Sequence, residues 1–188
     1  MKKFYAMLLC VIVAASSMSF SAKNWRAIVD VGFGYMMLSN KEVAMNETIS
    51  RDGVDKCTII QPLISAGYQH NRLFLGGGLG CNLDTPGFAS SLPLFAHIRY
   101  DFFKNDPKLF SPFVSFRAGY CVSLNTRWYD GGAFVNPTIG IRKGLSATLG
   151  LNLSVSYSLL GKGIYGEGVF EDYKANLSAI TASIGLDF

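Results

Sequence analysis

The sequence predicts an all-β fold, an eight-stranded antiparallel up-and-down β-barrel, from three observations. Eight separate segments alternate between apolar residues and polar or small residues, and a period of two sorts side chains onto the two faces of a strand. Each segment has about 10 to 13 residues, the length that a tilted strand needs to cross a bilayer. Beyond the amino-terminal segment, no apolar run reaches the roughly 20 residues of a membrane-spanning helix. A transmembrane barrel satisfies all three observations.

The last segment, 177–188, shows the pattern up to its final residue. Its apolar face carries Ile180, Ala182, Ile184 and Leu186, and its other face carries Thr181, Ser183, Gly185 and Asp187. No helix would separate these residues onto two sides. The seven preceding strands are predicted at 25–37, 58–69, 72–82, 92–102, 112–124, 133–142 and 149–159.

The amino-terminal segment, 1–21, has the features of a secretory signal peptide, which leaves 22–188 as the outer-membrane barrel domain. Its parts are the positive Lys2 and Lys3, an apolar run over 6–15, and the small Ser19 and Ser21 before the cleavage point. The apolar run is too short to span a bilayer as a retained anchor. We therefore expect an exported protein.

The predicted connections and aromatic residues give the barrel two different ends. Connections at 38–57, 83–91, 125–132 and 160–176 are long, whereas those at 70–71 and 143–146 are short and 103–111 is intermediate. Long outer loops and short periplasmic turns are typical of outer-membrane barrels. Outward-facing aromatic residues gather near both ends of the strands, as in membrane-interface girdles. The predicted interface aromatics are Trp25, Tyr35, Tyr68, Tyr100, Tyr120, Tyr157 and Phe188.

Two stretches resemble a known family. The closing residues 184–188 and the segment 111–120, together with the strand set, resemble the small eight-stranded outer-membrane barrels: the OmpA transmembrane domain, OmpX and the porin-family barrels of Bacteroidetes. The resemblance implies an outer-membrane location among lipids and lipopolysaccharide. It also implies that the assembly machinery reads the final strand with its terminal Phe188. The family has no shared catalytic motif.

The inward faces predict a polar lumen. An eight-stranded barrel has an interior that side chains can fill, and buried charges must pair or hydrogen-bond. The predicted lumen ion network is Arg26, Asp30, His97, Arg99, Asp101, Arg117, Arg142 and Asp187. We expect this network to plug the barrel, with a narrow conduction path along it as the alternative. The glycines at 76–80 are expected to make room for the arginines.

Strand register predicts that the three cysteines remaining after the signal peptide do not pair. A tight turn at 70–71 would place Tyr68 opposite Leu73 and Ile60 opposite Cys81. Cys81 would then face lipid while Cys57 and Cys121 face inward. We expect all three to serve as small apolar residues.

Enzymatic, metal and nucleic-acid functions find little support. The two histidines are His70, in an inner turn, and His97, in the lumen, and neither could reach a lipid acyl chain. No cofactor or metal-ligand set is evident. The net charge is +4 without a dense basic run, which argues against nucleic-acid binding.

The predicted function is therefore non-enzymatic, a structural or adhesive role through extracellular loops. The first, third and fourth outer loops are the candidate contacts for an extracellular ligand. The first alternative is a narrow porin-like channel for ions or small solutes. The second is a soluble lipocalin-like barrel, which would have an apolar lumen and a polar exterior.

Overall fold

The computed structural model describes residues 24–39, 57–85, 91–103, 110–124, 129–146, 149–165 and 173–188. The predicted signal peptide lies outside them. The strands are β1 (Trp25–Ser39), β2 (Cys57–His70), β3 (Leu73–Gly80), β4 (Leu83–Thr85), β5 (Ser91–Asp101), β6 (Phe110–Ser123), β7 (Tyr129–Gly144), β8 (Gly150–Tyr165) and β9 (Tyr173–Asp187). None of the described residues forms a helix long and apolar enough to span a membrane.

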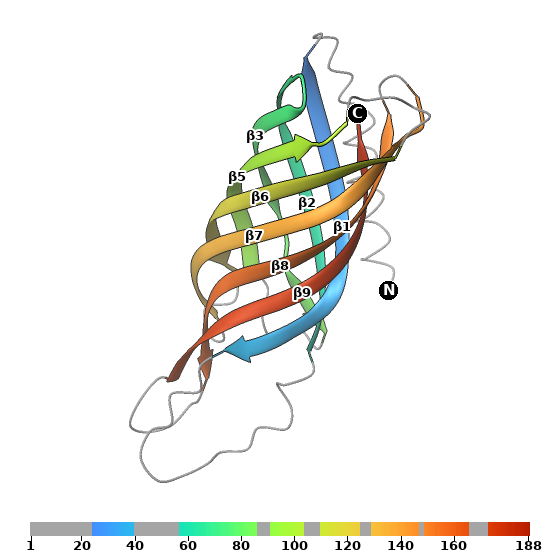
Figure 1. Ribbon diagram of the computed structural model, residues 1–188. Coiled ribbons are helices and arrows are strands. Elements are labelled where there is room, and N and C mark those ends of the chain that lie inside the picture. The colour runs from blue at the N-terminus through green and yellow to red at the C-terminus, as the bar shows by residue number, and fades with distance from the viewer. Residues whose placement is uncertain are drawn as a thin grey trace, which may run out of the picture.

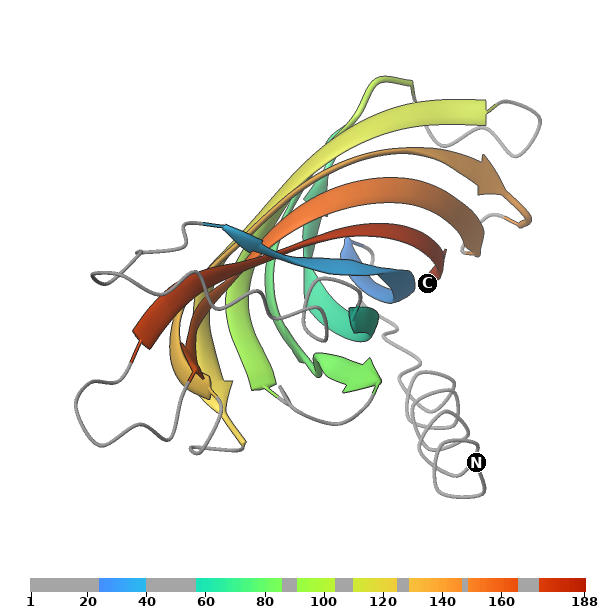
Figure 2. The same cartoon turned by 90° about the horizontal axis from the view of Figure 1, so that it is seen from below.

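The strands close into one antiparallel barrel (Figure 1). Apart from β4, each strand pairs with the next along the chain, β3 pairs with β5, and β1 pairs with both β2 and β9. Strands β3 and β4 both pair with β2, so they form one stave that is interrupted around Asn82. Seen from below, the staves curve around a common interior (Figure 2). The predicted eight-stranded, all-β barrel is confirmed.

The two ends of the barrel are distinguished by the strand termini. We call the end that holds Trp25, the β2–β3 turn and Phe188 the inner end, at the top of Figure 1, and the opposite end the outer end. Strands β7, β8 and β9 extend further toward the outer end than their alternation predicts. Register shifts near Gly131 and between Leu159 and Lys162 accompany this extension, and such irregularities interrupt a period of two.

The predicted register of the β2–β3 hairpin is wrong by two residues. His70 pairs with Leu73 around a turn of Asn71 and Arg72, so Tyr68 lies opposite Leu75 rather than Leu73. Asn71 has a φ of 53°, a left-handed conformation that asparagine tolerates. Ile60 correspondingly pairs with Leu83 instead of Cys81. A shift of two leaves every side chain on its original face, so alternation alone could not detect it.

The barrel wall has an apolar exterior, and its buried polar and charged side chains lie inside. Large apolar side chains that face outward are about half exposed, for example Phe33, Leu75, Ile139 and Ile184 at 49%, 52%, 66% and 51%. Soluble monomers rarely expose so continuous an apolar surface. This distribution is the reverse of that expected for a lipocalin-like barrel.

Candidate functional site

All of the predicted lumen residues are buried inside the barrel. They come from the inward faces of β1, β5, β6, β7 and β9. None is more than 6% exposed. The structure places Arg26, Asp30, His97, Arg99, Asp101, Arg117, Arg142 and Asp187 in this set.

Asp187 forms the first centre of the network. Arg142 donates to it from Nε at 2.7 Å and from Nη2 at 2.8 Å. Arg26 donates from Nη2 at 2.5 Å, and Nη1 of Arg99 lies 3.9 Å away. One buried carboxylate therefore faces three guanidinium groups.

Asp101 forms a second centre beside it. It accepts from Nη1 of Arg26 at 3.0 Å and from Nε of Arg99 at 2.8 Å. Arg99 also stacks on the ring of Phe113, with 3.7 Å from Cζ to the ring centroid, and donates to Asn152 at 3.2 Å. Arg26 and Arg99 thus connect Asp101 to Asp187. Hydrogen bonds between charged partners such as these are stronger than those between neutral groups.

The third centre is the Asp30–Arg117 ion pair, which lies deeper along the lumen. Arg117 donates from Nη2 to Asp30 and from Nη1 to Asn136 at 3.1 Å. Asn136 donates on to Ser158 at 2.6 Å, which in turn donates to Gln61 at 3.3 Å. This polar chain extends from the ion pair across the barrel interior to β2.

His97 occupies a different environment from the ion pairs with which the sequence grouped it. Its Nδ1 lies 2.9 Å from the hydroxyl of Ser65. Its ring meets those of Phe74 and Phe95 edge-on, at centroid distances of 5.1 and 6.4 Å. His97 is therefore held by a hydrogen bond to Ser65 and by aromatic packing.

An apolar layer fills the outer part of the lumen, and sequence reasoning did not identify it. Its members share inward positions on seven strands and are at most 6% exposed. They are Met36, Ile59, Leu63, Phe95, Cys121, Phe134, Leu160, Leu177 and Ala179. Position in the alternation could have revealed this layer. Met36 is an even number of residues from the inward Asp30, and Ile59 is two residues from the inward Gln61, so both lie on inward faces although they are apolar. The strand pattern had placed Cys121 inward, but the predicted lumen list held only polar and charged residues, so the layer was not recognised.

The glycines of β3 accommodate aromatic rings rather than arginines. A Cβ on Gly76 would lie 2.8 Å from Cζ of Phe74, and one on Gly78 would lie 2.8 Å from Cε2 of Phe95. The expectation that these glycines make room for arginines is therefore wrong. The glycine that does so is Gly150, beneath Arg142.

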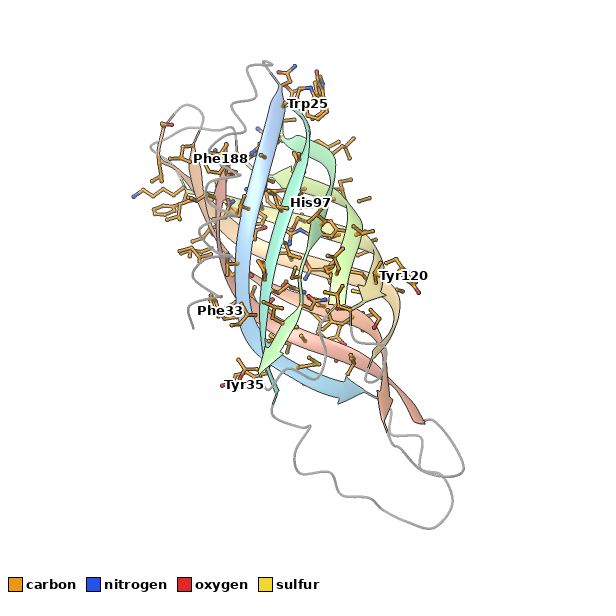
Figure 3. All side chains as sticks on the ribbon, turned by 180° about the vertical axis from the view of Figure 1, so that it is seen from behind. Trp25, Phe33, Tyr35, His97, Tyr120 and Phe188 are labelled. Carbon is orange, nitrogen blue, oxygen red and sulfur yellow. The ribbon has the colours of Figure 1, made fainter. Side chains whose placement is uncertain are left out.

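The predicted interface aromatics lie on the barrel exterior or at its inner rim. Trp25 and Phe188 lie at the inner end, whereas Phe33 and Tyr35 lie nearer the outer end (Figure 3). Tyr35, Tyr68, Tyr100, Tyr120 and Tyr157 all face outward and are at least 39% exposed. Tyr157 is placed near the middle of β8 because that strand runs on to Tyr165.

The cysteines lie in different settings. Cys81 faces outward and is partly exposed, and Cys121 is buried in the apolar layer, where Asn82 lies 3.7 Å from its Sγ. The side chain of Cys57 lies outside the described residues. Among the described side chains, no group of His, Cys, Asp and Glu could hold a metal ion.

Comparison with known proteins identifies the architecture. No family model matches the chain, and no curated protein does so. Among solved structures, Neisserial surface protein A is similar with a TM-score of 0.61 and 14% identity, over 87% of this chain and 95% of that one. The outer-membrane protein AlkL, determined in lipid bilayers, has a TM-score of 0.50 and 12% identity over 90% and 92% of the two chains.

The fold is that of a small outer-membrane β-barrel. At these identities the likeness concerns the fold alone, and function has to be derived from the barrel's own lumen and surface. In this barrel the lumen holds two ionic centres joined by Arg26 and Arg99 toward the inner end, a separate Asp30–Arg117 pair deeper inside, and a packed apolar layer toward the outer end.

Proposed function

We propose that this protein is a non-enzymatic barrel of the bacterial outer membrane, with a sealed lumen and a structural or adhesive role. On this proposal residues 1–21 direct export, the strand ending at Phe188 is read by the assembly machinery, and the barrel is of the OmpA, OmpX or Bacteroidetes porin-family type. Its extracellular loops, outside the described residues, would contact a surface ligand or lipopolysaccharide.

Close contacts between buried side chains of the lumen are the observation that supports this proposal. Arg117 reaches across the barrel to Asp30, and Phe134, 0% exposed, packs against Phe95 with 5.5 Å between ring centroids. A solute moving through the barrel would have to displace both the ionic centres and the apolar layer. Separating a buried ion pair leaves two charges without compensation, so the proposal expects transient opening to be disfavoured.

The positions of the histidines support a non-enzymatic role. The chain has two histidines; His70 lies beside the inner-end turn and His97 is 2% exposed within the lumen. Neither can act as a general base at the outer surface, where lipopolysaccharide would be encountered.

Planar-bilayer recording combined with a cell-adhesion assay tests the proposal. We expect no reproducible single-channel steps from the wild-type protein. Loss of the gene should reduce surface adhesion or envelope integrity without changing the uptake of small solutes. Steps that disappear in Arg117→Ala would overturn the sealed lumen in favour of a narrow channel. A mature protein that stays soluble without detergent would overturn the membrane location.

A further inference from the structure

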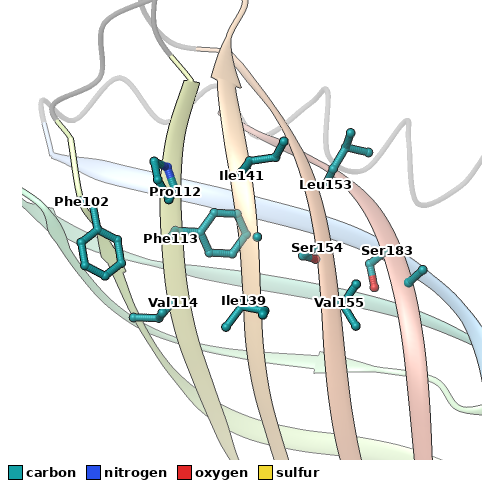
Figure 4. Close-up of a pocket in the computed structure, with 12 residues that line it drawn as sticks. Phe102, Pro112, Phe113, Val114, Ile139, Ile141, Leu153, Ser154, Val155 and Ser183 are labelled. Atoms are coloured by element: carbon teal, nitrogen blue, oxygen red, sulfur yellow. The ribbon is translucent and has the colours of Figure 1, made fainter.

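A shallow apolar groove crosses the exterior of the barrel wall. It has a volume of about 620 Å³ and extends over β6, β7, β8 and β9 (Figure 4). Two rows of outward side chains flank it, and register places the members of each row side by side. One row is Val114, Ile139, Val155 and Ala182, and the other is Pro112, Ile141 and Leu153.

The groove runs diagonally from the inner rim into the apolar wall. One end is bounded by Phe102, directly after β5 at the inner end, and the other by Ala182 in the middle part of β9. Between the rows, the floor consists of Gly140, Ser154 and Ser183, which pair with one another across the strands. An extended apolar chain entering at the rim would follow this course.

A second hollow adjoins the groove at the inner rim. It has a volume of about 470 Å³ and is lined by His70, Asn71, Arg72, Leu73 and Tyr100. The rings of Tyr100 and Phe102 meet edge-on, with 5.4 Å between centroids. This aromatic pair separates a polar hollow at the turn from the apolar groove beside it.

Two basic side chains are exposed at the inner rim beside the groove and the hollow. Arg72 and Lys143 are exposed there, and Lys143 lies 5.2 Å from the ring centroid of Phe110, next to the groove. The aspartates whose burial the structure describes, Asp30, Asp101 and Asp187, lie in the lumen and not at this rim. The rim therefore complements an anion, while the groove complements a hydrocarbon chain.

We propose that an anionic phospholipid of the inner leaflet binds at this combined site, an inference that rests on the membrane location proposed above. The lipid phosphate lies at Arg72, within reach of Tyr100, and one acyl chain follows the groove from Phe102 toward Ala182. Lys143 faces the headgroup from the other side of the groove entrance. Close packing in the groove supplies dispersion contacts, and the cations supply selectivity for negative headgroups.

Native mass spectrometry after reconstitution tests this site. The full-length mature protein is inserted into vesicles of equal phosphatidylglycerol and phosphatidylcholine, extracted in mild detergent, and analysed for retained lipid. We expect retention of phosphatidylglycerol over phosphatidylcholine. Arg72→Gln should lower that preference about fivefold, the effect of one basic residue at an anionic surface, whereas Arg72→Lys should preserve it.

A matched pair of variants tests the groove itself. Ala182→Phe fills the deep end of the groove and should abolish selective retention. Ala96→Phe places the same ring at an exposed outward position on β5, outside the groove, and should leave retention unchanged. Equal effects of the two substitutions, or equal retention of both lipids by the wild type, would overturn the lipid site. Failure of the protein to float with the vesicles would instead overturn the membrane location.

Discussion

Arg142 on β7 makes a two-point contact with Asp187 on β9, across the intervening strand β8. Nε of Arg142 donates to one carboxylate oxygen at 2.7 Å and Nη2 to the other at 2.8 Å. Gly150 of β8 lies between the two residues, and a Cβ there would lie 2.5 Å from both Arg142 Nε and Asp187 Oδ1. The contact therefore depends on the absence of a side chain at position 150 as much as on the two charges.

Gly150→Ala should destabilise the barrel by about 1 to 3 kcal/mol, the usual cost of overpacking. The added methyl group must displace the Arg142–Asp187 pair. Equilibrium urea unfolding in lipid vesicles measures the change. The control is Gly77→Ala, where the nearest atom to the new Cβ lies at 3.4 Å, and it should change stability by less than about 0.5 kcal/mol. Equal effects of the two substitutions would argue against a crowded ion pair.

Asp187→Asn should be more harmful, by about 3 to 5 kcal/mol, because removing one partner leaves buried charge uncompensated. Asp187 faces Arg142, Arg26 and Arg99. In the same unfolding experiment, Asp187→Asn combined with Arg142→Gln should cost less than the sum of the single substitutions, as expected for residues in contact. Strict additivity would indicate that the pair contributes little.

The lumen also shows where sequence reasoning succeeds and where it stops. Alternation assigned Arg142 and Asp187 to the inward face because a strand has a period of two. It could not assign their pairing, since that depends on the stagger of β7, β8 and β9, and a slip of two residues preserves every face. The β2–β3 hairpin shows the same limit, because Tyr68 pairs with Leu75 although the alternation is equally consistent with Leu73.

The apolar layer in the outer half of the lumen was missed for a different reason, because apolar side chains occur both inside and outside this barrel. Phe134 and Leu160 face inward, although both are apolar residues of a barrel whose exterior is also apolar. In a protein surrounded by lipid, hydrophobicity alone does not separate interior from exterior. Only position within the strand distinguishes them, and the irregular pairing near Gly131 and Leu159 obscures that position.

Phe134→Ala should destabilise the barrel by about 3 to 5 kcal/mol, because it leaves a cavity in a packed apolar layer. Phe134 is 0% exposed and packs against Phe95. The matched substitution is Phe116→Ala on the lipid-facing side, where the ring is 45% exposed and lipid can fill the space left behind. Unfolding free energies in the same vesicles give the comparison. A smaller loss for Phe134→Ala than for Phe116→Ala would show that the outer lumen is not tightly packed.

Trp25 should report a shallow position at the inner membrane interface. It is 49% exposed at the inner end of β1, and aromatic girdles lie at the headgroup level. Trp128→Phe leaves Trp25 as the single tryptophan, since the chain has two. Its fluorescence should then be quenched more by lipids brominated near the headgroup than by lipids brominated near the acyl terminus.

A deeper reference for that measurement is available on the same strand. Val31 occupies an outward position on β1 between Trp25 and Tyr35. Val31→Trp, in a chain lacking both native tryptophans, places the fluorophore further into the apolar wall. It should be quenched more by the terminally brominated lipid, because each residue of a strand advances the chain by about 3.3 Å before tilt is considered. If both tryptophans gave the same depth profile, Trp25 would not lie at an interface and the predicted inner aromatic girdle would have to be abandoned.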